Sequence, residues 1–374
     1  MNQKLKPPIP LFVDSHEDLA WNMLTFGRDY TLSSQQIRFI EKDAIAPHVN
    51  GDTMLGWADY QSANVGLIFS TLFAAPIDTK EGDWDIQTYR NQQEAHNQYL
   101  QQLDAYDRML DRHHDQFRSI RSKEDLRNLL ADRSTSLDTS DSDGSNLPIG
   151  LVRLMEGADA IRRPEELPEW VERGVCLLGL AWHSTAYSGG TTEPGPLTKA
   201  GYRLLAQMED CGCSLDLSHM DEKSVWQALD AFSGRVMVSH SSPEALLTER
   251  RSNRFLSDNI IRALAERDGV MGLVPYNLFL DAAWQRGDEK NLVTIHRLVE
   301  QIDYVCQLLG SARFTGIGTD FDGGFGWQST PKELNSIADM PIILPLLEEK
   351  GYSEQDMHLI FGMNWIRFLQ EALP

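Results

Sequence analysis

The chain has 374 residues, of which 41% are hydrophobic and 24% are charged. This length allows one large barrel or two ordinary domains, and either arrangement can bury a substantial core. Acidic residues outnumber basic ones by 55 to 34, which gives a formal net charge of -21 at pH 7. This charge argues against nucleic acid and against an anionic membrane surface as partners.

The cysteines and the N-terminal residues indicate the compartment. The first residues, MNQKLKPPIPLFVD, run through prolines into an apolar segment and lack the long apolar region and cleavage site of a signal peptide. No apolar run reaches the roughly 20 residues of a membrane span. We therefore expect a soluble cytoplasmic protein with reduced thiols. The four cysteines form no CxxC pair and are Cys176, Cys211, Cys213 and Cys306.

Eight short apolar segments recur along the chain, each bounded by turn residues. Their near-continuous apolar character is typical of the buried strands of a parallel sheet. The predicted strands cover residues 10–16, 65–74, 147–157, 175–183, 213–219, 235–242, 269–276 and 314–323.

Segments with helical character lie between many of these strands and follow the last one. Ser257 and Ser353 are predicted helix starts. Glycines stand where five helices should end, at Gly212, Gly234, Gly269, Gly310 and Gly351. The predicted helical segments cover residues 85–115, 198–212, 221–232, 257–268, 291–310, 337–351 and 353–369.

This alternation predicts the fold class. Strands that alternate with helices form a parallel α/β sheet, and eight of them point to a closed (β/α)8 TIM-type barrel. An open doubly wound sheet is the alternative, but its glycine-rich phosphate loop is absent after the first strand, where the sequence reads DSHEDLAW. We predict a single domain, residues 1–374.

The predicted domain carries an insertion between its second and third strands, at about residues 77–146. It contains a long helical segment followed by a mobile loop rich in serine and aspartate. A lid over the mouth of the barrel is one interpretation of the insertion, and a solvated helical excursion is the interpretation we favour.

Ionisable side chains stand at the C-terminal ends of the predicted strands, which meet at one mouth of a barrel. A single histidine there is usually a hydrogen-bonded structural residue. Three histidines and several carboxylates together would be costly to bury without a cation. The strand-end residues are His16 and Asp18, Glu156, Trp182 and His183, His219, His240, and Asp320 with Asp322.

The chemistry of this set predicts a metal site. His16 and Asp18 lie two residues apart and so share one face of an extended strand. Imidazoles and carboxylates without thiolate suit Zn²⁺ and also tolerate Mn²⁺ or Co²⁺. Five candidate ligands exceed the usual three of a single catalytic zinc, so we predict two metals that share a bridging carboxylate.

Five short motifs, in chain order, resemble those of the membrane (renal) dipeptidase family, zinc-dependent dipeptidases with an amidohydrolase-like barrel. The resemblance runs from the first strand to GMNWIR near the C-terminus. The family's opening D-x-H-x-D-x-x-x-W pattern matches residues 14–21, less one spacer. Its E-G, D-L-[AS]-H, S-H-S and G-x-D-F-D-G motifs match residues 156–157, 216–219, 239–241 and 318–323.

The resemblance implies which residues hold the metals. His16 and Asp18 would bind one zinc ion, His219 and His240 would bind the other, and Glu156 would bridge them. A water or hydroxide between the metals would be the nucleophile, because two cations lower its pKa toward neutrality.

The resemblance also implies the reaction. Asp320 would be the acid/base residue, and Arg254 would hold the substrate carboxylate through its forked donors. The implied function is a binuclear zinc hydrolase that cleaves dipeptides, including those with a C-terminal D-residue. An amidase or lactonase acting on another small carboxylate-bearing metabolite is one alternative, and a non-catalytic metal-binding barrel is another. Retention of both Glu156 and Asp320 favours an enzyme.

Two positions depart from the family pattern and concern the substrate. Where the family has a substrate-contacting histidine after the fourth strand, Trp182 stands in register and His183 follows it. In the family this histidine also helps to stabilise the oxyanion that forms in the reaction. Either a one-residue shift brings His183 into the mouth of the barrel, or the oxyanion is held by metal alone. Phe279 replaces a family tyrosine that assists the arginine, with Tyr276 as a candidate substitute. Trp182, His183 and Arg254 are therefore the candidate substrate-binding residues.

Three further expectations have no catalytic content. Asp322 should orient the turn after the eighth strand, and Asp216 should hydrogen-bond a loop. Family members often form dimers, so a homodimer is one expectation that the sequence leaves open.

Overall fold

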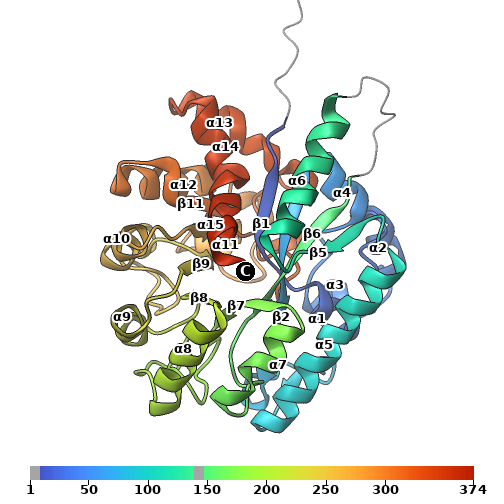
Figure 1. The fold of residues 1–374 in the computed structure, drawn as a ribbon. Helices are drawn as coiled ribbons and strands as arrows, with labels where there is room; N and C mark the ends of the chain where they lie inside the picture. The colour runs from blue at the N-terminus through green and yellow to red at the C-terminus, as the bar shows by residue number, and fades with distance from the viewer. Residues whose placement is uncertain (1–8, 139–146) are drawn as a thin grey trace, which may run out of the picture.

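The computed structural model describes residues 9–138 and 147–374, and its centre is a closed parallel barrel (Figure 1). The strand order is β2-β1-β11-β10-β9-β8-β7-β6, and β2 closes the ring by pairing with β6. The prediction of a (β/α)8 barrel is confirmed. Its eight strands are β1 (Phe12–Glu17), β2 (Val65–Leu72), β6 (Ile149–Met155), β7 (Val175–Gly179), β8 (Ser214–Asp216), β9 (Val236–Ser241), β10 (Met271–Leu273) and β11 (Thr315–Ile317).

Several strands stop earlier than predicted. β7 ends at Gly179, although the apolar sequence continues to Trp182, and β11 ends at Ile317, six residues before the predicted end. Beyond these ends the chain leaves the sheet, and Trp182 and Asp320 reach the mouth of the barrel. A short extra strand, β5 (Phe117–Ser119), pairs with the first residues of β6.

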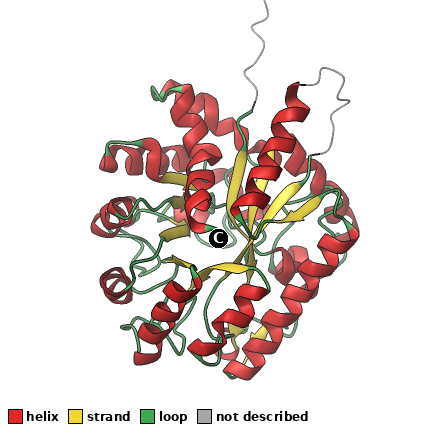
Figure 2. Ribbon diagram, viewed as in Figure 1, coloured by secondary structure: helices red, strands yellow, loops and turns green. Residues whose placement is uncertain are grey.

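Helices surround the barrel (Figure 2). All seven predicted helical segments contain helices, and Gly212 and Gly310 end two of them in left-handed conformation, at φ 71° and 65°. The helices in the predicted segments are α5 (Gln92–Arg112), α8 (Lys199–Cys211), α9 (Glu222–Ala231), α10 (Asp258–Glu266), α12 (His296–Leu309), α13 (Ile343–Glu349), α14 (Glu354–His358) and α15 (Asn364–Ala372). Gly234 and Gly269 do not cap helices in this way.

The remaining helices were not predicted. Most have seven or fewer residues, too few for an apolar period to show. They are α1 (Leu19–Thr25), α2 (Ser34–Glu41), α3 (Ala46–Val49), α4 (Trp57–Ser62), α6 (Lys123–Asp138), α7 (Leu167–Glu172) and α11 (Asn277–Leu280).

The predicted insertion packs against the barrel. The Tyr99 and Tyr106 hydroxyls of α5 donate to the carbonyl oxygens of Glu156 (2.6 Å) and Thr71 (2.9 Å). The interpretation of this segment as a solvated excursion is therefore wrong, because one face of α5 covers β2 and β6. Part of the predicted loop is helical up to Asp138, and its residues 139–146 lie outside the described residues.

The barrel centre is filled with apolar side chains and closed at one end by α15. Val13, Phe69, Leu154 and Met237, from four strands, form one cluster with Trp365 of α15. The indole N–H of Trp365 donates to the carbonyl oxygen of Ile317 at 3.2 Å. The opposite end, at the C-terminal ends of the strands, is left for the site.

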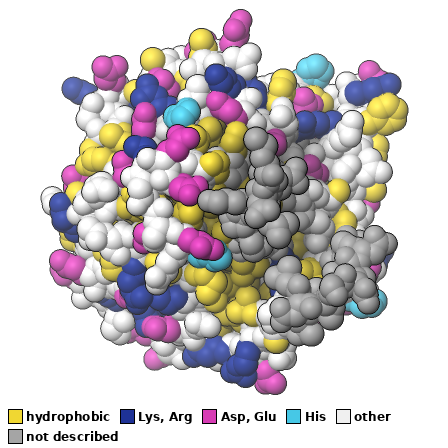
Figure 3. Space-filling model, turned by 90° about the horizontal axis from the view of Figure 1, so that it is seen from above, with side chains coloured by type: hydrophobic (Ala, Val, Ile, Leu, Met, Phe, Trp, Pro, Cys, Tyr) yellow, Lys and Arg dark blue, Asp and Glu magenta, His cyan; other side chains and the backbone are white. Residues whose placement is uncertain are grey.

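The surface and the cysteines agree with the composition. On the face shown in Figure 3, the described basic side chains stand singly or in small groups among acidic ones, so no broad basic surface forms there. The cysteines make no disulfide, and three of the four are buried. Among the described helices, none has the length and apolar character needed to cross a bilayer.

Candidate metal centre and active site

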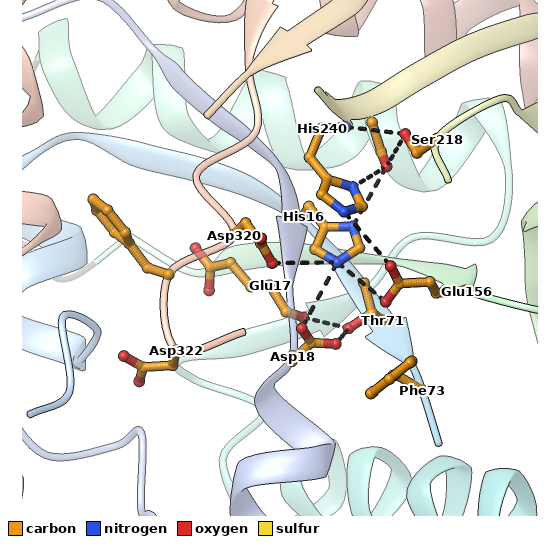
Figure 4. A network of polar contacts seen from close by, with 12 residues as sticks. His16, Glu17, Asp18, Thr71, Phe73, Glu156, Ser218, His240, Asp320 and Asp322 are labelled. Carbon is orange, nitrogen blue, oxygen red and sulfur yellow. Dashed lines mark hydrogen bonds and ion pairs between the residues drawn. The ribbon is translucent and has the colours of Figure 1, made fainter. Parts of the chain in front are cut away.

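The five predicted metal ligands meet at the C-terminal mouth of the barrel. Figure 4 shows four of them, His16, Asp18, Glu156 and His240. Glu156 lies between two groups of ligands. Its Oε2 is 3.4 Å from His16 Nε2, which in turn is 3.7 Å from Asp18 Oδ2. Its Oε1 is 3.1 Å from His219 Nε2 and 3.5 Å from His240 Nε2. Each carboxylate oxygen of Glu156 therefore faces a different ligand group.

Asp320 lies at the edge of the same cluster. Its Oδ1 is 3.8 Å from His16 Nε2, and its backbone N–H donates to the His16 carbonyl oxygen at 3.1 Å. Asp320 also belongs to one of the three described groups whose potential ligand atoms lie within 4.8 Å of one another. These groups are His16 with Asp18 and Glu156, Glu156 with His219 and His240, and His16 with His240 and Asp320.

The local backbone is bent to bring these side chains together. His219 and Asp320 have left-handed conformations, at φ 64° and 56°, which only a few per cent of non-glycine residues adopt. A Cβ at Gly323 would collide with the Asp320 carboxylate, so glycine is needed there. The Thr71 hydroxyl, near the end of β2, lies within hydrogen-bond distance of both the Asp18 carboxylate and the Glu17 carbonyl oxygen, next to the start of α1.

The donor set fits divalent metal ions. His16, His240, Asp18 and Glu156 are at most 6% exposed, and His16 Nε2 has no hydrogen-bond partner in the structure. His219 Nε2 and His240 Nε2 are 3.0 Å apart. So many buried lone pairs aimed at one space would be unfavourable without a cation to accept them.

The electrostatics of the cluster keep two of its histidines neutral. Burial lowers the pKa of His219 to about 4, with Arg254 adding to the effect, and burial also holds the pKa of His240 well below its usual range. The pKa of His16 is raised well above its usual value. Burial alone would lower this pKa, but the Glu156 and Asp18 carboxylates favour the charged form and together outweigh burial. Neutral imidazoles carry the lone pairs that metals require.

The pKa values of Asp320 and Glu156 are shifted in opposite directions. Burial raises the pKa of Asp320 well above its ordinary value, and the Asp18 and Glu156 carboxylates add to the rise. Burial also acts to raise the pKa of Glu156, but the adjacent His16 and His219 imidazoles lower it further than burial raises it. Glu156 is thereby held as an anion, while Asp320 is suited to hold a proton.

A cavity of about 320 Å³ opens over the cluster. Its size suits a small ligand rather than a long chain. Its floor contains Asp18, Glu156, His219, His240 and Asp320. Its walls are largely aromatic and contain Trp21, Phe73, Trp84, Trp182, Tyr276, Phe279 and Phe325.

Arg254 provides a buried cation on the cavity wall. It is 4% exposed, and its Nη2 donates to the His240 carbonyl oxygen at 2.6 Å. Its Nε and Nη1 have no hydrogen-bond partner in the structure, and its guanidinium carbon lies 5.4 Å from the Phe279 ring centroid. A buried guanidinium with free donors is the group expected to receive a ligand carboxylate.

The structure places Trp182 and His183, which follow β7, in different surroundings. Trp182 lines the cavity, and its ring lies 5.1 Å from that of Phe73. His183 does not line it, since its Nδ1 is engaged by Thr191 O (3.0 Å) and Thr192 Oγ1 (2.8 Å), and its Nε2 lies 3.4 Å from Glu193. The one-residue shift that would bring His183 into the mouth does not occur.

Asp322 has the structural role expected of it. It is fully buried, and its carboxylate accepts hydrogen bonds from the Tyr30 hydroxyl (2.9 Å), the Thr53 hydroxyl (2.5 Å) and the Met54 N–H (2.8 Å). It also pairs with Arg28 at 3.0 Å. These contacts tie the turn after β11 to the segment that follows α1, and thereby support Asp320.

Several cavity residues were not predicted. Trp21 stands in the opening motif, but no role followed from it. Trp84, Glu81 and Asp85 line the cavity from the inserted segment, next to the short strands β3 (Ala75–Pro76) and β4 (Thr88–Tyr89). One signal was a tryptophan in an otherwise polar stretch, EGDWD.

The fold and this cluster define a class of protein: a (β/α)8 barrel enzyme whose metal-binding centre lies at the C-terminal mouth. The family model for membrane dipeptidases (Peptidase family M19) matches residues 3–373. The chain therefore belongs to the membrane dipeptidase family, a family of metallo-dipeptidases.

Individual relatives are distant. A Klebsiella pneumoniae protein, described as uncharacterized and encoded in the pqqA 5' region, is 29% identical over 234 residues, which are 60% of this chain and 82% of that protein. A dipeptidase of Aspergillus oryzae is 29% identical over 225 residues, 60% of this chain and 50% of its own length. The chain thus spans about half the length of that dipeptidase.

The fold is shared with solved structures. A crystal structure of a metallopeptidase from Rhodobacter sphaeroides, liganded with a phosphinate mimic of the dipeptide L-Ala-D-Ala, superposes with a TM-score of 0.77 at 21% identity. The match covers 98% of this chain and all of that one.

Proposed function

We propose that this protein hydrolyses the amide bond of dipeptides with the help of two zinc ions. His16 and Asp18 would hold one ion, His219 and His240 the other, and Glu156 both. The observation that carries the proposal is the position of Glu156, whose two oxygens face the two ligand groups at 3.4 Å and 3.1 Å. Mn²⁺ or Co²⁺ would also suit these ligands.

The residues around the cluster would divide the chemistry. When bound, such a metal pair supplies Lewis acidity and lowers the pKa of coordinated water. Asp320, whose pKa is raised by burial, would accept a proton and pass it to the leaving amine. Arg254 would bind the terminal carboxylate and orient the scissile amide over the floor of the cavity.

The substrate class follows from the cavity. A volume of about 320 Å³ with one buried free guanidinium suits a short peptide with its own carboxylate. The dipeptide mimic bound by the R. sphaeroides enzyme supports dipeptides, including those with a C-terminal D-residue. Trp182 would contact the substrate, whereas His183 leaves the candidate set. The amidase, lactonase and non-catalytic alternatives gain no specific support from the cavity.

Substrate pairs with and without a free carboxylate test this proposal. Replacing Arg254 with alanine should lower kcat/KM for a dipeptide about 100-fold, since charge-assisted hydrogen bonds contribute about 1.5–3 kcal/mol. Hydrolysis of the matching dipeptide amide should be slow in the wild type and little changed by the substitution.

Arg262 is a suitable control position, because its side chain donates to the Leu308 carbonyl oxygen in an exposed contact away from the cavity. Arg262→Ala should leave both substrates unaffected. If Arg254→Ala lowered kcat/KM equally for the dipeptide and for its amide, the carboxylate-binding role of Arg254 would be refuted.

The cytoplasmic location and the homodimer remain predictions from the sequence.

A further inference from the structure

A buried carboxylate lies behind the ligand imidazoles, outside the set of proposed metal ligands. Asp216, at the end of β8, is 2% exposed and forms no ion pair among the described residues. Its Oδ1 accepts the Ser218 N–H (3.0 Å), the Ser218 hydroxyl (2.7 Å) and the Ser239 N–H (2.9 Å). Its Oδ2 accepts the Ser239 hydroxyl at 2.5 Å.

The Ser239 hydroxyl joins this carboxylate to two histidines. Its Oγ lies 2.8 Å from His240 Nδ1 and 3.4 Å from His16 Nδ1. A hydroxyl has one hydrogen to donate and two lone pairs. An ionised carboxylate can only accept, so the hydroxyl hydrogen goes to Asp216 and both lone pairs remain for the imidazoles.

This count assigns the hydrogens on the two rings. Ser218 does not compete, because its own hydroxyl donates to Asp216 Oδ1 at 2.7 Å. His16 and His240 must then both carry a hydrogen on Nδ1, so that Nε2 is bare in the neutral, metal-binding form of each ring. The two bare nitrogens lie 3.4 Å and 3.5 Å from different oxygens of Glu156.

We propose that Ser239, anchored by Asp216, is a positioning residue that orients one histidine ligand of each metal and so sets the affinity of both metal sites. The proposal rests on the proposed metal-dependent function. His219 is held separately, with its Nδ1 3.0 Å from Thr191 Oγ1. Hydrogen-bond partners of metal-bound histidines typically change metal affinity 10–100-fold.

The test is metal binding by the metal-depleted full chain, titrated with Zn²⁺ against a competing chelator. Ser239→Ala should weaken both metal equivalents about 10–100-fold, because two imidazole N–H groups lose their shared acceptor. Thr191→Ala should weaken a single equivalent. Ser70→Ala is the matched control, since Ser70 is a fully buried strand serine whose hydroxyl donates to the Val152 carbonyl oxygen at 3.2 Å.

Folding of each variant is checked by thermal unfolding of the metal-free protein. Ser239→Cys, which keeps the volume but offers a weak acceptor, should weaken both equivalents as well and carries the test if the alanine variant does not fold. A folded Ser239 variant that binds both metals within twofold of wild type overturns the proposal, while wild-type metal binding and dipeptide turnover would still support the function. A wild-type protein that binds no metal would instead refute the function itself.

Discussion

Replacing Asp320 with asparagine is expected to lower kcat for dipeptide hydrolysis about 10³-fold, the usual contribution of a general acid/base group. The carboxamide has nearly the same shape but cannot accept and return a proton. Its oxygen can still occupy the position 3.8 Å from His16 Nε2, so metal content should be unchanged. Steady-state kinetics and metal analysis of one preparation measure both quantities.

The matched control is Asp159→Asn. Asp159 is also a buried carboxylate, 9% exposed, but it accepts hydrogen bonds from Tyr89 and Ala186 and does not line the cavity. Its substitution should reduce stability and leave kcat nearly unchanged. If Asp320→Asn lost its metals along with activity, the acid/base assignment would be replaced by a metal-ligand role.

Replacing Glu156 with glutamine is expected to weaken both metals more than 100-fold and to abolish turnover. Loss of a hydrogen-bond partner of a metal ligand typically costs about 10–100-fold in metal affinity. Loss of the charge shared by both sites should cost more than that. The two oxygens of Glu156 face different ligand groups, so the two metal equivalents should be lost together. Metal analysis after dialysis, with chelator titration, measures the loss.

The fold of this variant provides the internal control. The Glu156 backbone N–H bonds to the Leu72 carbonyl oxygen at 3.0 Å and its own carbonyl oxygen accepts the Tyr99 hydroxyl, so its position does not depend on the carboxylate. The metal-free glutamine variant should therefore unfold at a temperature close to that of metal-free wild type. Retention of two metals by this variant would contradict the bridging role.

The barrel and the ligand cluster could be predicted because both depend on local sequence. Each apolar segment is long enough to stand out in the sequence, and each ligand lies at the end of its strand or within a few residues after it. His16 and His240, for example, are the penultimate residues of β1 and β9. Parallel strands bring their C-terminal ends to one mouth, so residues far apart in sequence meet without any further information.

The walls of the cavity could not be predicted in the same way. β7 ends at Gly179, and irregular chain precedes Trp182, so strand alternation could not show which of Trp182 and His183 faces the mouth. Trp84 reaches the cavity from an insertion whose path depends on how α5 packs. The contact between Asp216 and Ser239 depends on the register of β8 with β9, where Asp216 lies opposite Met237.

We propose this barrel as a two-metal dipeptidase. The most direct test of this proposal is metal content per chain of protein purified without chelator, measured together with hydrolysis of L-L and L-D dipeptides. We expect about two zinc equivalents per chain and dipeptide turnover that is lost on chelation and restored by zinc. Protein without bound metal, whose activity is indifferent to chelator and zinc, would contradict the proposal.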